Sequence, residues 1–279
     1  MLYRPLSASP SLSKPPRFTV DKVVEPKPAL SSAELDEFKA NGFLNLGRVL
    51  SDADVARFIE MFDNDRRQFP YMWHTYGYHQ EANYEALISS PHFDELIRHP
   101  TIYPKIVALF GGPVCFGEIG LRRMRNYDGQ THQEWHRDRG YWFEHPLRLD
   151  YMQLIVYLSD VDESTHCFSI SPESITDPPL KEAAEQLKRR EGVNLEGPAG
   201  TCALFNVALF HTATTRATQA ERKTVQIYYG HRDRAPLAND SGIPATLSRH
   251  PSDTETREFY SNLNERTKLF MAAYQTRTH

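Results

Sequence analysis

Short extended segments, separated by turns, make up most of the chain from Val114 onward, and they limit the folds that it can adopt. The segments do not alternate regularly with helices, which argues against a doubly wound parallel sheet. We therefore predict a mainly β protein, built as an antiparallel barrel or sandwich. The predicted strands cover residues 114–126, 133–138, 151–158, 168–170, 201–210 and 224–232, and residues 181–191 are predicted to form a charged helical insertion.

The part of the chain before these strands is predicted to supply an N-terminal helical layer. Its apolar residues recur at helical spacing, and Ser, Asp and Asn-Gly stand where caps and stops are expected. Residues 1–30, rich in Ser, Pro and Lys, are predicted to form an extended or disordered arm, and residues 31–279 a single domain. The predicted elements are a helix after Ser31 or Ser32, a strand at residues 43–46, a helix after Ser51 or Asp52, and helices near residues 83–89 and 103–110.

Composition narrows the class of function. The formal net charge of -4 and the pI of about 6.3 provide no general basic field that would attract nucleic acid or an anionic membrane. The three cysteines contain no Cys-x-x-Cys pair, which argues against a disulfide framework or a thiolate zinc site. The apolar runs are too short to span a bilayer, and the N-terminus lacks the apolar core of a signal peptide. We expect a cytoplasmic protein.

The segment Gln133-Glu134-Trp135-His136-Arg137-Asp138 carries the strongest chemical signal. On an extended strand, side chains two residues apart project to the same side, so the imidazole of His136 and the carboxylate of Asp138 would converge. One imidazole and one carboxylate are two of the three ligands of a facial triad, which holds a divalent metal. His211 is the candidate for the third ligand, because it closes an apolar run that is predicted to be a buried strand.

The order His136-x-Asp138, then His211 and Arg222, resembles the pattern of the phytanoyl-CoA dioxygenase family of iron(II)- and 2-oxoglutarate-dependent oxygenases. The likeness extends over most of the chain, from about residue 30 to residue 229. It includes residues 37–44, which are similar to the family's opening helix and strand, residues 99–114, similar to the helix before its barrel, and residues 135–138, similar to its metal strand.

The resemblance implies a double-stranded β-helix, the cupin-like jelly-roll barrel, with Fe(II) held by His136, Asp138 and His211. It also implies that Arg222 binds the distal carboxylate of 2-oxoglutarate, which is converted with O2 to succinate and CO2. The chemistry agrees, because a facial triad leaves three positions for the keto acid and O2, and a guanidinium matches a carboxylate. Because Asp138 keeps its carboxylate, hydroxylation, desaturation or ring formation is favoured over halogenation.

Two further polar residues are predicted to contact the keto acid. Thr224 closely follows Arg222, and Gln153 lies on a predicted strand, where a solvent-facing position is an equal alternative. Arg216 competes with Arg222 for the co-substrate carboxylate. The alternative role of Arg222 is a surface ion pair with Glu221.

Substrate contacts are predicted for four residues near the metal segment. Three of them follow that segment directly, where a loop could cover the substrate, and packing within a surface loop is the alternative. The fourth shares a strand face with Arg125, and a solvated face is the alternative there. These four residues are Arg139, Tyr141, Trp142 and Arg123. We interpret the aromatic cluster at residues 71–79 as packing between the helical layer and the barrel rather than as a lid.

A second His-x-Asp occurs at His231-Arg232-Asp233, and we interpret it as a turn or surface feature because neither later histidine ends an apolar strand. Two other classes of function stay open. A cupin-like isomerase or hydrolase would use the same ligands with another metal and no keto acid. Arg222 discriminates between the two, because its replacement by Ala should abolish 2-oxoglutarate dependence in an oxygenase and matter little in the alternative. A catalytically silent barrel would bind a ligand or a protein, and the intact triad argues against it.

Overall fold

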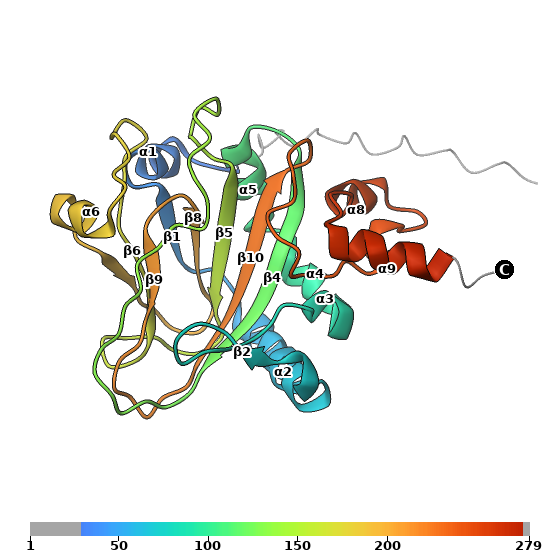
Figure 1. Cartoon of the computed structure of the whole chain (residues 1–279), viewed down its shortest axis with the longest axis horizontal. Coiled ribbons are helices and arrows are strands. Elements are labelled where there is room, and N and C mark those ends of the chain that lie inside the picture. The colour runs from blue at the N-terminus through green and yellow to red at the C-terminus, as the bar shows by residue number, and fades with distance from the viewer. Residues whose placement is uncertain (1–28, 276–279) are drawn as a thin grey trace, which may run out of the picture.

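The computed structural model describes residues 29–275, so the predicted arm at residues 1–30 lies almost entirely outside the described part of the chain. Two antiparallel sheets form the centre of the protein (Figure 1). The larger sheet has seven strands in the order β1-β8-β5-β10-β4-β3-β2, and the smaller has three in the order β7-β6-β9. The strands are β1 (Phe43–Arg48), β2 (His74–Thr75), β3 (Glu81–Asn83), β4 (Val114–Met124), β5 (Tyr151–Tyr157), β6 (Cys167–Ile170), β7 (Val193–Leu195), β8 (Thr201–Asn206), β9 (His211–Thr214) and β10 (Arg222–His231).

Helices cover the outer face of the larger sheet and both of its ends (Figure 1). None of the helices among residues 29–275 is both long and apolar enough to cross a membrane. The α-helices are α1 (Ser32–Asn41), α2 (Asp52–Gln68), α3 (Ala86–Ser89), α4 (Asp94–Ile97), α5 (Tyr103–Phe110), α6 (Ala183–Arg189), α7 (Ala245–Ser248), α8 (Thr254–Phe259) and α9 (Glu265–Gln275), and short 3-10 turns lie at Pro70–Met72 and Pro91–Phe93.

The first helix begins and ends where its sequence predicts. Ser31 accepts a hydrogen bond from the backbone N–H of Glu34, whose carboxylate accepts one from the Ser31 N–H in return, forming a capping box. Gly42 ends α1 with a φ of +73°, a left-handed conformation that favours glycine. A Cβ at this position would also lie 2.8 Å from Leu209, so Gly42 permits close packing of α1 against the turn that precedes β9.

Alternation along β10 separates an apolar core from a polar interior. Val225, Ile227 and Tyr229 face the helical layer and belong to the main hydrophobic core. The intervening residues face the space between the two sheets, where a second apolar cluster contains Phe168, Phe205 and Ile155. Four polar side chains lie on this inner face of β10, namely Arg222, Thr224, Gln226 and Tyr228. A row of buried polar groups therefore runs between the sheets.

The fold class is confirmed, because the chain is mostly antiparallel sheet in a jelly-roll arrangement with helices, although continuous strand pairing does not close the barrel in the described residues. Two predicted strands need correction. Residues 133–138 form no regular strand. Their backbone pairs with the smaller sheet at the isolated bridge between His136 and His211, and Gln133 and Glu134 add hydrogen bonds to threonine side chains of β9. The apolar run at residues 201–210 breaks after Asn206, whose side-chain and backbone oxygens accept from the Ala208 and Leu209 N–H groups. His211 therefore begins β9 instead of ending β8.

Candidate metal centre

Three potential ligands from distant parts of the chain meet at one end of the space between the sheets. One ligand atom from each of His136, Asp138 and His211 lies within 4.8 Å of the other two, and no second such group occurs among the described residues. The Nε2 atoms of both histidines are 3.5 Å from Oδ1 of Asp138. A first-row divalent ion holds such ligands at about 2.1 Å, so neighbouring ligand atoms are about 3 Å apart around it. The two separations between a histidine Nε2 atom and Oδ1 of Asp138 would need to shorten only slightly to match this spacing.

Backbone carbonyls orient both imidazole rings. Nδ1 of His136 lies 2.8 Å from the carbonyl oxygen of Glu134, and Nδ1 of His211 lies 3.0 Å from that of Leu209. A carbonyl oxygen can only accept, so Nδ1 carries a proton in each ring and Nε2 is the nitrogen that faces Asp138. Two imidazole nitrogens and one carboxylate oxygen therefore converge. These are the atoms that would bind a divalent cation.

The Asp138 carboxylate is held in its charged form. Its side chain is largely buried, which disfavours ionisation, but interactions with His211, His136 and the Tyr228 hydroxyl outweigh burial and lower the pKa of Asp138 to about 2. The Tyr228 hydroxyl donates to Oδ2 at 3.0 Å, which leaves Oδ1 for an ion. Burial and the neighbouring His211 lower the pKa of His136, so its ring is neutral at pH 7. Two imidazoles and one carboxylate are the donor set of a facial triad.

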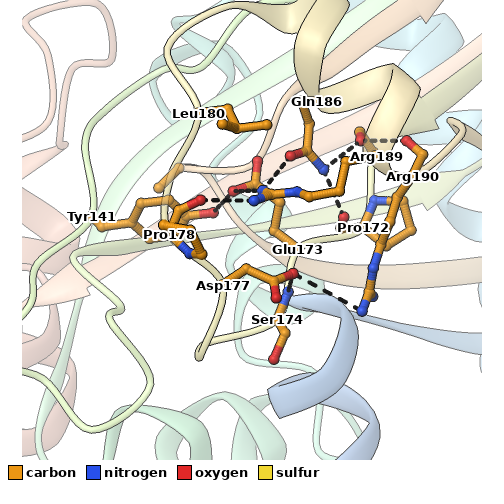
Figure 2. Close-up of polar contacts among 12 residues, drawn as sticks. Tyr141, Pro172, Glu173, Ser174, Asp177, Pro178, Leu180, Gln186, Arg189 and Arg190 are labelled. Atoms are coloured by element: carbon orange, nitrogen blue, oxygen red, sulfur yellow. Dashed lines mark hydrogen bonds and ion pairs between the residues drawn. The ribbon is translucent and has the colours of Figure 1, made fainter.

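Arg137, between two of the ligands, anchors the metal segment to the loop before α6. Figure 2 shows Glu173 and Leu180 on this loop, with Tyr141 directed at Glu173. Its guanidinium donates to Oε1 of Glu173 at 2.6 Å and to the Leu180 carbonyl at 3.1 Å, and it stacks 3.8 Å above the Phe210 ring. The Glu173 side chain is only 2% exposed and also accepts from the Tyr141 hydroxyl at 2.8 Å. Side-chain contacts thus stabilise the irregular segment at residues 133–138, whereas a regular strand would be stabilised by backbone hydrogen bonds to its neighbours.

We predict that Glu173→Gln lowers the affinity for Fe(II) by about 10-fold, within the range seen when groups behind metal ligands are changed. The cause is the loss of a buried charge partner for Arg137, which would free the segment that carries His136 and Asp138. Thermal stability should also fall, since breaking a buried ion pair costs about 3 kcal/mol. Anaerobic metal titration measures the affinity. Asp177→Asn, at the more exposed edge of the same loop, is the control. A stability loss with unchanged metal affinity would show that Glu173 is only structural.

A cavity of about 330 Å³ opens beside the triad. Tyr76, Gly77 and Tyr78 form part of its wall, so the interpretation of residues 71–79 as packing alone was wrong for these three. The cavity is lined by Tyr76, Gly77, Tyr78, Gln80, Arg122, His132, Glu134, His136, Asp138, Phe168, His211, Thr212, Ala213, Gln226 and Tyr228.

Unpartnered polar atoms lie deeper between the sheets, next to this cavity. Arg222 is 1% exposed, and its Nε and Nη2 atoms have no hydrogen-bond partner, while Nη1 donates to the Cys167 carbonyl. Thr224 Oγ1 and Gln153 Oε1 are also buried without a partner, and Gln153 Nε2 donates to Gln226 at 2.9 Å. Burial lowers the pKa of Arg222, yet a guanidinium stays protonated at pH 7. A buried cation with two free donors is matched to an anion.

None of the four residues predicted to contact substrate lines this cavity. Arg139 pairs with Asp150, and Tyr141 donates to Glu173. Trp142 packs on the far side of the larger sheet between His145 and His231, and Arg123 pairs with Glu221 and Glu81. Alternation on β4 places Arg122, not Arg123, on the inner face, where it lines the cavity.

Arg216 and the second His-Arg-Asp tripeptide, which competed with the proposed site in the sequence, make other contacts. Nη1 of Arg216 donates to the carbonyls of Asp162, Glu163 and Thr165. The same atom pairs with Glu196 at 3.5 Å, and Arg216 does not line the cavity. His231 lies 3.0 Å from the Leu149 carbonyl, and the second His-Arg-Asp tripeptide forms no ligand cluster among the described residues.

Glu118, on the inner face of β4 opposite Tyr228, is buried, and this burial raises its pKa to about 8. Folded protein therefore retains this proton between about pH 4.5 and 8, where the unfolded chain releases it, so stability falls as pH rises through that window. We predict that Glu118→Gln removes this contribution to the pH dependence of stability. In metal-free protein, the variant should melt several degrees above the parent at pH 8 and no higher at pH 4.5. Thermal melts from pH 4.5 to 8 measure this, with the exposed Glu191→Gln as control.

Known proteins resemble this chain in sequence and in fold. Residues 38–224 match the family described as phytanoyl-CoA dioxygenase (PhyH). The chain is 23% identical over 245 residues to L-proline trans-4-hydroxylase of Streptomyces griseoviridis, covering 75% of this chain and 89% of that protein. Its structure is similar to EctD from S. alaskensis with bound Fe (TM-score 0.64, 19% identity, 82% of this chain and 86% of that chain). It is also similar to the epimerase SnoN in complex with Fe3+, alpha ketoglutarate and nogalamycin RO (TM-score 0.63, 18% identity, 85% and 98%).

Proposed function

The chain belongs to the phytanoyl-CoA dioxygenase family, and on this basis we propose that it is an Fe(II)- and 2-oxoglutarate-dependent oxygenase that oxidises a small-molecule metabolite. The single observation that carries the proposal is the convergence of two imidazole nitrogens and one carboxylate oxygen from His136, Asp138 and His211. Relatives with this fold support it, since EctD has been crystallised with Fe, and SnoN with Fe3+ and alpha ketoglutarate.

The protein's own residues divide the work. His136, Asp138 and His211 would hold the ion, and Tyr228 would keep the carboxylate of Asp138 oriented through its hydrogen bond to Oδ2. Arg222 would bind the distal carboxylate of 2-oxoglutarate through Nε and Nη2, with Thr224 and Gln153 as polar neighbours. When bound, iron with 2-oxoglutarate and O2 supplies the oxidising power, and the co-substrate leaves as succinate and CO2.

We infer that the reaction is a hydroxylation or a related oxidation. Asp138 keeps the carboxylate ligand whose loss would open a position for halide, so halogenation is disfavoured. The hydroxylase relative supports insertion of oxygen into a C–H bond, whereas the epimerase SnoN shows that proteins with this fold also catalyse other outcomes. A cupin-like isomerase or hydrolase that needs no keto acid is the alternative function.

The test is a two-stage experiment on the purified protein. Anaerobic addition of Fe(II) and 2-oxoglutarate together should produce a weak visible charge-transfer band that neither component gives alone. Admission of O2 should then release succinate and CO2 in equal amounts, slowly without substrate and faster with it. A protein that binds a divalent ion but gives neither the band nor succinate would favour the isomerase or hydrolase alternative. A protein that binds no divalent ion at this site would contradict both.

A further inference from the structure

Arg122 places a second unpaired positive charge in the cavity. Its side chain comes from the inner face of β4, is largely buried and lines the cavity together with the triad. Nη2 donates to the Tyr84 hydroxyl at 2.8 Å, and the guanidinium stacks 4.5 Å from the Tyr76 ring. Nε is buried without a hydrogen-bond partner. The tyrosines therefore orient the guanidinium without neutralising it.

No ion pair neutralises Arg122 within the part of the chain that the structure describes. Its strand neighbours differ, since Arg123 pairs with Glu81 and Glu221, and Arg125 pairs with Glu81. Glu118 lies on the same face of β4, but its carboxyl is protonated at neutral pH because burial raises its pKa to about 8. A buried guanidinium that lacks a carboxylate partner costs folding free energy unless a bound anion pairs with it.

The co-substrate does not account for this charge. One carboxylate of 2-oxoglutarate would bind the ion beside its keto oxygen, and Arg222 would bind the other. Arg122 lies opposite Thr224 in the pairing of β4 and β10, near enough for its charge to help lower the pKa of Arg222. Arg122 nevertheless lines the cavity with the triad, whereas Arg222 is not part of that lining and donates to the Cys167 carbonyl. The two guanidiniums can therefore bind two different anions, one in the cavity and one beside Cys167. A planar guanidinium recognises a carboxylate through paired N–H donors.

We propose, building on the oxygenase function above, that Arg122 binds a carboxylate of the primary substrate, so that the enzyme oxidises small carboxylic acids. The size of the cavity, about 330 Å³, suits a compact molecule. Gln80 Oε1 and His132 Nε2, buried and without partners, line the same cavity and provide sites for a hydroxyl or amino group of such an acid.

The experiment uses holoenzyme with Fe(II) and 2-oxoglutarate and a set of amino, hydroxy and simple carboxylic acids, each paired with its neutral amide or methyl ester. In the parent, acids should accelerate succinate release and their neutral partners should not. Arg122→Gln should raise KM for the best acid by about 10- to 100-fold, the loss expected for a charged hydrogen bond, and leave the 2-oxoglutarate affinity from the anaerobic band unchanged. Arg122→Lys should recover part of the lost affinity for the acid. Because this variant keeps the positive charge, it still tests the inference if Arg122→Gln does not fold.

Arg123→Gln is the matched control, because it removes the same charge from the adjacent residue outside the cavity and should leave both constants unchanged. The inference is overturned if neutral partners accelerate turnover as well as acids do, if no acid in the set does, or if Arg122→Gln weakens 2-oxoglutarate instead. Failure of the oxygenase proposal itself can be distinguished from failure of this inference, because the parent would then give no band and no succinate.

Discussion

Asp138→Ala is expected to abolish the Fe(II) and 2-oxoglutarate band and to reduce succinate formation by at least about 1000-fold. The substitution removes the carboxylate that both Nε2 atoms approach at 3.5 Å, and it leaves two imidazoles as the only protein ligands. His211→Ala should have an equal effect for the same reason. Anaerobic spectroscopy with a metal titration separates loss of binding from loss of turnover, and circular dichroism checks the fold.

The chain provides a matched control for this prediction. Residues 136–138 and 231–233 have the same sequence, His-Arg-Asp, but only the first tripeptide meets another histidine side chain as part of a ligand cluster in the described residues. Asp233→Ala changes an exposed residue at the equivalent position and should retain the band and the activity. Equal losses in Asp138→Ala and Asp233→Ala, or retention of Fe(II) in Asp138→Ala, would contradict the assignment of the triad.

Local chemistry made much of the fold predictable. The capping box of Ser31 and Glu34, the left-handed Gly42 and the apolar run of α5 each depend on residues a few positions apart, so the sequence contains all the information that they need. The triad was predictable for a different reason. Ligand chemistry requires two imidazoles and a carboxylate whatever their separation, and the resemblance to a family indicated which distant histidine would complete the set.

Long-range geometry set the limits of prediction. The segment at residues 133–138 brings its ligands together without a regular strand, because Arg137 binds Glu173, a partner that no periodicity indicates. Register also decides which of two adjacent arginines enters the cavity, and a shift of one residue exchanges Arg122 for Arg123. The Tyr76 and Tyr78 rings reach the cavity through tertiary packing of a short hairpin, which their own sequence does not specify.

Arg222→Gln is expected to raise KM for 2-oxoglutarate by at least about 100-fold, because it removes the charge that we propose to pair with the distal carboxylate. Arg222→Lys should recover only part of the affinity, since an ammonium cannot form the planar pair of hydrogen bonds. Succinate release at varied 2-oxoglutarate concentrations measures both. Arg216→Gln is the control, because Arg216 was the competing candidate and its guanidinium is committed to backbone carbonyls. A larger loss in Arg216→Gln than in Arg222→Gln would reverse the assignment.

The same substitution should affect stability with the opposite sign. In the protein without co-substrate, the Arg222 guanidinium is 1% exposed and two of its donor atoms have no partner, so it costs folding free energy. Arg222→Gln should therefore melt at the same or a higher temperature than the parent when 2-oxoglutarate is absent. Adding Fe(II) and 2-oxoglutarate should raise the melting temperature of the parent and hardly change that of the variant. If Arg222→Gln instead destabilised the ligand-free protein severely, Arg222 would be a structural residue satisfied by contacts within the chain, and the co-substrate would require another anchor.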